Sequence, residues 1–344
     1  MTARKTPNEG ETALFDRRGL LAGAGLLLAA GQASAQVPAG PSATAADPAA
    51  GLPVLPPDQT LLLWPGSPPN LGSRTPASGP PTQPSGKARG ISTPTLGVYR
   101  PARPDGSAVI VCPGGGYAML SMELEGSSPA RRFNQDGVTV FVLTYRLPAE
   151  GWAEPAVVPL QDIQRAVRLV RARAAEFGVD PRRVGVLGFS AGGHLCASLA
   201  NQHARQTYAP VDSADAQSAK PALAALIYPV VTMLPPLTYA PGLPLLLGAN
   251  PSQAAMEAWS NERLVNADTP PVFIAQGLDD RLVPVENSLM MLAAMRAANR
   301  PVEAHLFQQG RHGFGIGIPG QSNQDWPRLF VAWMRDVAPA AGRS

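Results

Sequence analysis

The sequence predicts an α/β sandwich in which helices flank a mainly parallel central sheet. From residue 93 onward, short apolar runs alternate with longer segments of helical periodicity, as in repeated strand–helix units. Several of the runs are continuously apolar, which is typical of parallel strands buried on both faces. The predicted strands span residues 96–99, 108–112, 138–145, 184–187, 222–228, 272–275 and 302–307.

The segments between these runs have the pattern of helices. In one of them Ile163, Val167 and Val170 recur at steps of three and four residues, which places them on one face. The predicted helices span residues 128–135, 160–177, 193–202, 285–298 and 325–337. The proline-rich stretch 231–267, between the strand that ends near 228 and the strand that begins at 272, is the expected place for a small cap.

The first 35 of the 344 residues predict an export signal. Arg17 and Arg18 precede an apolar run at 19–30, and the small residues at 33–35 are typical of a cleavage site. The apolar run is short for a membrane span, so no stable membrane anchor is expected after processing. Paired arginines favour the twin-arginine route over an ordinary secretory signal. Either route predicts a periplasmic or secreted protein.

The rest of the chain predicts a leader followed by one domain. Residues 36–60 are rich in Ala and Pro and lack apolar periodicity, which indicates a flexible leader and leaves 61–344 for the folded domain. The whole chain has 28 basic and 25 acidic residues, a net charge of +3. Because this balance is nearly neutral and no dense Lys/Arg stripe is present, nucleic acid is not an expected partner.

The chain has two cysteines, Cys112 and Cys196, which are too few for a disulfide framework. Export permits a disulfide between them, but both lie in predicted buried elements, which favours small core residues. No Cys/His spacing resembles a metal site, so neither a metal nor an organic cofactor is expected.

The pentapeptide Gly188-Phe189-Ser190-Ala191-Gly192 matches G-x-S-x-G between a predicted strand and a predicted helix. Strand, G-x-S-x-G and helix together form a nucleophile elbow, a tight turn that exposes the serine hydroxyl. The turn leaves no room for side chains at Gly188 and Gly192. One such match is weak evidence in a chain with 34 glycines. Its meaning depends on whether a base, an acid and oxyanion donors accompany Ser190.

The base is predicted from four histidines. His312 lies in a glycine-flanked loop directly after the last predicted strand. Loops at the carboxyl edge of a parallel sheet commonly carry ligand-binding and catalytic residues. His194 lies one helical turn beyond Ser190 and cannot easily reach back to its hydroxyl. His203 falls near the end of the same helix and His305 falls within a strand. His312 is therefore the predicted base.

The acid is predicted after strand 272–275, where Asp279 and Asp280 are adjacent. Both qualify on their chemistry, since one can face the histidine while the other is solvated. With either aspartate, the order of nucleophile, acid and base is the order found in α/β-hydrolases.

A glycine-rich segment supplies candidate oxyanion donors. The predicted strand 108–112 runs into Pro113-Gly114-Gly115-Gly116-Tyr117, and consecutive glycines let backbone N–H groups face a developing negative charge. The alternative, a phosphate-binding loop, is disfavoured because G-x-G-x-x-G spacing is absent and no predicted helix begins there.

With these motifs the chain resembles the carbohydrate-esterase-like branch of the α/β-hydrolase superfamily, related to acetylxylan esterases and hormone-sensitive-lipase-type esterases. The resemblance covers roughly residues 61–338. It is carried by the segments 112–117, 125–126, 145–147, 188–194, 269–271, 280–288 and 312–315. Two departures are Pro113, in the place of the histidine of the commoner glycine motif, and Leu124, where many relatives carry histidine.

The resemblance also implies roles for particular residues. In the family the acid stands three residues after a glycine and four before a proline, and Gly277 and Pro284 place it at Asp280. The implied oxyanion donors are the backbone amides of Gly115, Gly116 and Ala191.

The motifs and the resemblance together predict a serine esterase that works through an acyl-enzyme. Ser190 is the expected nucleophile, His312 the base and Asp280 the acid that orients it. The predicted export and the resemblance favour an acetylated plant polysaccharide, such as xylan or its oligosaccharides, as the ester substrate. The alternatives are a general short-chain carboxylesterase, a feruloyl esterase or, less favoured, a glycan-binding protein without activity.

Overall fold

The structure, a computed structural model, describes Met1 and residues 56–72 and 86–338. Apart from Met1, the predicted export signal at 1–35 lies outside the described residues, as does most of the predicted leader at 36–60. The end of the leader prediction is wrong by two residues, because a strand already begins at Gln59. Its backbone pairs with a neighbouring strand, and Leu61 is buried in the core.

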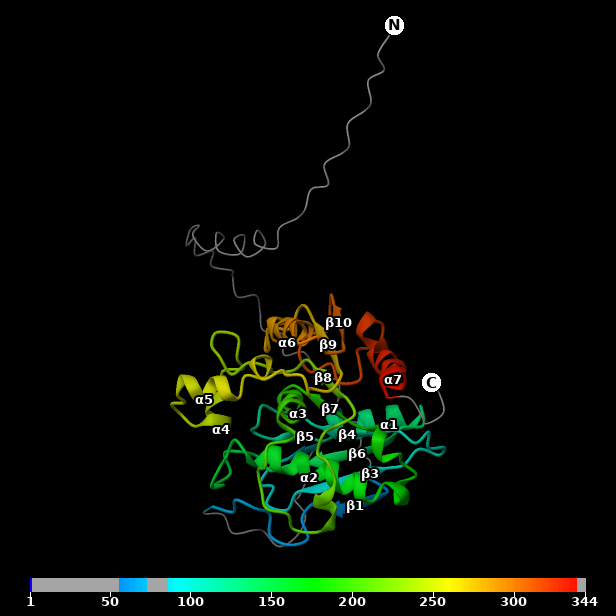
Figure 1. Cartoon of the computed structure of the whole chain (residues 1–344), viewed down its shortest axis with the longest axis vertical. Helices are drawn as coiled ribbons and strands as arrows, with labels where there is room; N and C mark the ends of the chain where they lie inside the picture. The colour runs from blue at the N-terminus through cyan, green and yellow to red at the C-terminus, as the bar shows by residue number, and fades with distance from the viewer. Residues whose placement is uncertain (2–55, 73–85, 339–344) are drawn as a thin grey trace. The chain divides into compact units, whose positions relative to one another are not determined.

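Within the described residues, eight strands form one sheet that is mainly parallel (Figure 1). The parallel strands are, in sheet order, β6 (Thr139–Thr144), β4 (Ala108–Cys112), β7 (Val184–Phe189), β8 (Ala224–Ile227), β9 (Val272–Gly277) and β10 (Val302–Phe307). Two antiparallel strands, β3 (Thr95–Tyr99) and β1 (Gln59–Leu62), extend the sheet beyond β6. The predicted α/β sandwich is confirmed.

Helices cover both faces of the sheet. Figure 1 shows α1 and α7 together on one side and α2, α3 and α6 on the other. Their bounds are α1 (Ser128–Asn134), α2 (Val158–Ala172), α3 (Ala191–Gln202), α6 (Glu286–Ala297) and α7 (Trp326–Val337). The predicted helix 160–177 is wrong at its end, because α2 stops before Arg173 and a 3-10 turn, η3 (Ala174–Phe177), follows. That turn buries Phe177, whose ring contacts Phe141 of β6 at 5.0 Å.

The stretch between β8 and β9 holds two short helices, α4 (Leu243–Leu247) and α5 (Gln253–Ala258), and a 3-10 turn, η6 (Asn261–Arg263). This is the place predicted for the small cap. Five further features of the described chain were not predicted: a two-stranded sheet of β2 (Lys87–Ala88) and β5 (Leu120–Ser121), a π-helix η2 (Glu123–Ser127), and the 3-10 turns η4 (Pro181–Arg183), η5 (Ser213–Ala216) and η7 (Ser322–Asp325).

The buried surface is apolar on both sides of the parallel strands, whose residues in β4, β6, β7, β8 and β9 are all buried. Cys112 and Cys196 are buried free thiols in this core. Among the described helices, none has the length and apolar character needed to cross a membrane.

Candidate active site

Ser190 lies in a sharp turn between β7 and α3. Its backbone has φ 52° and ψ −116°, a left-handed conformation that is costly for a residue with a side chain. The neighbouring glycines make the turn possible: a Cβ at Gly188 would lie 2.0 Å from the Gly192 carbonyl oxygen, and one at Gly192 would lie 2.0 Å from that of Cys112. The segment therefore has the geometry of a nucleophile elbow.

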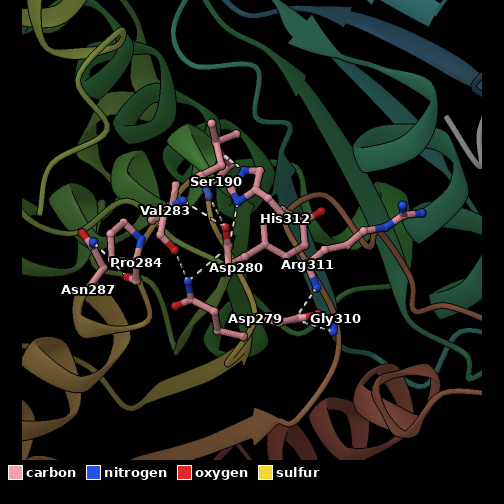
Figure 2. Close-up of polar contacts among 12 residues, drawn as sticks. Ser190, Asp279, Asp280, Val283, Pro284, Asn287, Gly310, Arg311 and His312 are labelled. Carbon is pink, nitrogen blue, oxygen red and sulfur yellow. Dashed lines mark hydrogen bonds and ion pairs between the residues drawn. The ribbon is translucent and has the colours of Figure 1, made fainter. Parts of the chain in front are cut away.

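In the structure Ser190, His312 and Asp280 form a hydrogen-bonded triad (Figure 2). His312 Nε2 is 2.9 Å from Ser190 Oγ, and His312 Nδ1 is 2.8 Å from Asp280 Oδ2. Since an ionised carboxylate only accepts hydrogen bonds, Nδ1 of the imidazole is the donor. In the neutral imidazole Nε2 then carries the lone pair and accepts the hydrogen bond from the serine hydroxyl.

Asp280 is held by the turn after β9. Its Oδ1 accepts hydrogen bonds from the amides of Leu282 and Val283, both at 2.9 Å, and Gln276 Nε2 lies 3.3 Å from Oδ2. The carboxylate side chain is fully buried, whereas the imidazole of His312 is 16% exposed. The acid is thus fixed on one edge by backbone donors and presents its other edge to the imidazole.

Asp279, the alternative acid, has a different set of contacts. Its Oδ1 accepts from the amides of Gly310 and Arg311, at 2.8 and 2.7 Å. Figure 2 shows this carboxylate facing the loop backbone, with the Arg311 side chain extending away from Ser190. Asp279 therefore holds the loop that carries His312, and Asp280 is the aspartate that contacts the imidazole.

The glycine loop lies beside Ser190. Gly115 and Gly116 have φ of 129° and 63°, and a Cβ at Gly115 would lie 2.3 Å from the Met119 carbonyl oxygen. Neither amide donates a hydrogen bond to another described residue. Ala191, whose amide is the third predicted donor, is the first residue of α3, where N–H groups have no partner within the helix. No helix of the described chain begins in the loop, as predicted.

Two tyrosines link this loop to the surrounding elements. Tyr145 Oη donates to the Pro113 carbonyl oxygen at 2.7 Å. Tyr117 Oη is 2.8 Å from His194 Nδ1, and His194 Nε2 is 2.8 Å from the carbonyl oxygen of Trp259. Burial lowers the pKa of His194 to about 4, so its imidazole is neutral, donates to Trp259 and accepts from Tyr117. His194 is a structural link between α3, the loop and the β8–β9 segment.

The remaining histidines lie elsewhere. His203 follows the last residue of α3, and burial lowers its pKa. His305 lies in β10, where its Nε2 is 2.8 Å from Glu303 Oε1. Neither residue is among those that line the cavity next to Ser190.

Ser190 and His312 open into a cavity of about 340 Å³. This is at the lower end of the range for small-molecule sites. The lining residues are Arg89, Gly115, Gly116, Ala118, Met119, Ser121, Glu125, Ser190, Tyr239, Leu282 and His312. Tyr239, from the β8–β9 segment, packs so closely on the loop that a Cβ at Gly116 would lie 2.9 Å from its ring.

Backbone strain is concentrated at this site. Apart from two asparagines, the non-glycine residues of the described chain with positive φ are Tyr117, Ser190, Tyr228 and Arg311. Ser190 is the candidate nucleophile, Tyr117 and Arg311 directly adjoin Gly116 and His312, and the Tyr228 ring lies 5.0 Å from the His312 ring. Strained backbone of this kind clusters at functional sites. Tyr228 and the cavity residues Arg89 and Tyr239 were not singled out from the sequence. For Tyr228 the sequence contains a signal, because this tyrosine is the last residue of a predicted buried strand. Its hydroxyl would lie at the carboxyl edge of the sheet and need a hydrogen-bond partner there.

A mainly parallel sheet that presents a strained serine, a carboxylate and an imidazole from the ends of β7, β9 and β10 defines the class of α/β-hydrolases. The profile of the BD-FAE family matches residues 96–295. The chain belongs to this family of carboxylic ester hydrolases.

Individual relatives carry more specific names. The chain is 37% identical over 208 residues, 60% of its length, to endo-1,4-beta-xylanase B of Butyrivibrio fibrisolvens. It is 33% identical over 243 residues, 70% of its length, to an acetylxylan esterase of Xylanibacter ruminicola. The chain spans about a third of the first relative (32%) and about half of the second (47%).

A solved structure is also similar along most of the domain. The acetyl ester-xyloside bifunctional hydrolase of Caldicellulosiruptor lactoaceticus superposes with a TM-score of 0.71 and 30% sequence identity. The match covers 82% of this chain and 97% of that one.

Proposed function

We propose that the protein is a serine carboxylesterase that removes acetyl groups from plant polysaccharide such as xylan, or from its oligosaccharides. The observation that carries the ester hydrolysis is the hydrogen-bonded triad Ser190–His312–Asp280, with bonds of 2.9 and 2.8 Å. It lies beside the amides of Gly115 and Gly116, which have no acceptor among the described residues. The sugar preference is supported by the names of two relatives, one an acetylxylan esterase and the other an acetyl ester-xyloside bifunctional hydrolase.

The proposed reaction has two halves. His312 Nε2 takes the proton of Ser190 as Oγ attacks the ester carbonyl, and Asp280 holds the imidazole and stabilises its charged form. The amides of Gly115, Gly116 and Ala191 receive the oxyanion. His312 then protonates the leaving alcohol, the sugar departs, and an acetyl group remains on Ser190. Water, deprotonated by His312, attacks this acyl-enzyme and releases acetate.

A fluorophosphonate probe tests the serine chemistry. The mature protein should be labelled and Ser190→Ala should not be. Ser198, on the same helix but buried against Asn261, provides a matched control, and Ser198→Ala should label like the parent. Absence of labelling, or labelling that survives Ser190→Ala, would refute the hydrolase proposal and favour a binding protein.

The substrate is tested by acetate release. Acetylated xylan and xylo-oligosaccharides should be deacetylated faster than acetylated mannan or pectin at equal acetyl concentration. Equal rates on all of them and on simple aryl acetates would favour a general short-chain carboxylesterase. Preferential release of ferulate would favour a feruloyl esterase.

We also propose that the protein is exported by the twin-arginine route and works in the periplasm or outside the cell. The support is the sequence pattern at Arg17, Arg18 and residues 19–35. A polymeric plant substrate fits that location, because such a polymer does not enter the cytoplasm.

A further inference from the structure

A buried carboxylate lies in the wall of the cavity and is not part of the Ser190–His312–Asp280 triad. Glu125 belongs to the π-helix η2 and is 5% exposed. Short π-helical turns are rare in proteins, and those that occur are often found at functional sites. A Cβ built at Gly114 would lie 2.9 Å both from Glu125 Oε2 and from Ser190 Cβ, so the carboxylate and the serine flank this glycine.

The two oxygens of Glu125 reach two different loops. Oε2 accepts the amide of Gly114 at 2.8 Å, immediately before the glycines proposed to bind the oxyanion. Oε1 accepts the hydroxyl of Tyr228 at 2.8 Å. The same hydroxyl accepts the amide of Gly315 at 3.2 Å, in the loop that carries His312. The four residues form a continuous link, called the Glu125 brace below, between the glycine loop and the His312 loop.

Tyr228 is placed to transmit this link. It is fully buried, and its φ of 38° is unusual for a bulky residue. Its ring lies 5.0 Å from the His312 ring in an edge-to-face arrangement and 4.6 Å from the Phe314 ring. A shift of Tyr228 would therefore move the imidazole as well as release the amide of Gly315.

We propose that Glu125 is a positioning residue for the hydrolysis, which fixes the oxyanion loop and the His312 loop relative to each other through Tyr228. The inference rests on the proposed function. Glu125 does not exchange a proton with the substrate in this proposal. Its ionised form is needed because only a carboxylate can accept from Gly114 and from Tyr228 at the same time.

The charge on Glu125 is held at a cost to stability. Burial raises the pKa of Glu125, while Tyr228, the charge of His312 and the Gly114 amide oppose that rise. The titratable or charged groups that act on it are Tyr228 directly after β8, Tyr145 directly after β6 and His312 after β10. Arg89, after β2, lines the same cavity. A carboxyl with a raised pKa stabilises the fold below the pKa of the unfolded chain and loses that contribution as pH rises.

Glu125→Gln tests the brace with little change of shape. The amide oxygen can still accept from Gly114, but the NH₂ group then faces Tyr228, whose hydroxyl proton has no acceptor. We expect kcat/KM on an acetyl ester to fall 10- to 100-fold, with KM changed less than threefold. Affinity for a boronic acid transition-state analogue should fall by the same factor as kcat/KM.

The melting temperature distinguishes a loss of positioning from a general loss of stability. At pH 8 the melting temperature of Glu125→Gln should equal or exceed that of the parent, because the buried charge is gone. Tyr228→Phe leaves that charge without its donor, so Glu125→Gln/Tyr228→Phe should be no less active than Tyr228→Phe alone. Glu123→Gln, on the same turn but outside the cavity lining, is the control and should stay within twofold of the parent.

Three outcomes for Glu125→Gln would each overturn the proposal. They are a kcat/KM like that of the parent, a loss confined to KM, and a loss of activity that accompanies a lower melting temperature. Amide hydrogen exchange gives a readout that does not need activity. Peptides covering 113–117 and 310–316 should exchange faster in Glu125→Gln than in the parent, and unchanged exchange at both would overturn the proposal. An inactive parent enzyme would refute the proposed function, whereas the exchange measurement would still decide the brace.

Discussion

Replacing either of the two adjacent aspartates by asparagine should have very different consequences. In Asp280→Asn, the amides of Leu282 and Val283 face the position of Oδ1 and require an acceptor there. The asparagine oxygen must occupy that position, which turns its NH₂ group toward His312 Nδ1. The imidazole can then only accept at Nδ1, so its proton moves to Nε2, the nitrogen that faces Ser190.

The magnitude follows from that tautomer. An imidazole protonated at Nε2 cannot take the serine proton, and the same change in another serine hydrolase costs about 10⁴ in turnover. At about 1.4 kcal/mol for each factor of ten, this corresponds to roughly 5 kcal/mol of lost transition-state stabilisation. We therefore expect kcat for an acetyl ester to fall by about 10⁴ in Asp280→Asn.

Asp279→Asn should be mild. The asparagine oxygen can take the place of Oδ1 and accept from the amides of Gly310 and Arg311 without moving the loop. What is lost is the charge on two hydrogen bonds, a difference of about 1 kcal/mol for each bond, or about thirtyfold in rate if all of it reached the transition state. Asp279→Asn is thus the matched control for Asp280→Asn.

The assay is the steady-state hydrolysis of 4-nitrophenyl acetate by both variants, with circular dichroism and thermal melting to confirm that each is folded. A rate in Asp280→Asn within tenfold of the parent would refute the tautomer argument. So would an equal or larger loss in Asp279→Asn.

Three other predictions can be checked independently. Gly192→Ala should destabilise the protein by about 3 kcal/mol or more, because its Cβ would lie 2.0 Å from the Cys112 carbonyl oxygen, whereas Gly66→Ala, with open space around it, should melt like the parent. Burial lowers the pKa of His194 to about 4, so between pH 6.5 and pH 4 the unfolded chain binds a proton at this residue that the folded chain does not bind. The free energy of unfolding should therefore fall by about 3 kcal/mol over that range. Denaturant titrations of His194→Gln should lack this part of the pH dependence. Arg17→Lys/Arg18→Lys should leave the precursor in the cytoplasm of a bacterial host, whereas Arg4→Lys should be exported like the parent; export of the double variant would favour an ordinary secretory route.

Most of the sheet could be predicted from the sequence because buried parallel strands are continuous apolar runs. β4 is such a run, and it begins and ends at the predicted residues. β10 also matches its predicted bounds, although it is only partly buried and contains Glu303 and His305. The pairing order could not be predicted, since β4 lies between β6 and β7 and that choice depends on packing between distant segments. The β2–β5 pair was missed because two-residue strands have no periodicity.

The placement of the candidate site shows the same division. Ser190 and His312 have local signals, the glycines beside each of them. Asp279 and Asp280 have the same local chemistry, so the residues alone leave both open, and the family resemblance is needed to place the acid at Asp280. In the fold, Asp280 contacts the imidazole and Asp279 holds the loop backbone. Glu125 and Tyr228 are 103 residues apart, so nothing in the neighbourhood of either residue indicates the other.

The separation between Ser190 and His312, 122 residues, has a consequence for synthesis. A chain that leaves the ribosome exposes the serine long before the imidazole exists, and α7, which packs against β9 and α1, emerges after both. The nascent chain therefore carries a serine with no base, and hydrolysis begins only when β10, the His312 loop and α7 have joined the fold. On a route that carries folded proteins, this assembly is complete before the protein leaves the cytoplasm. Any acetylated metabolite there would then meet a finished enzyme.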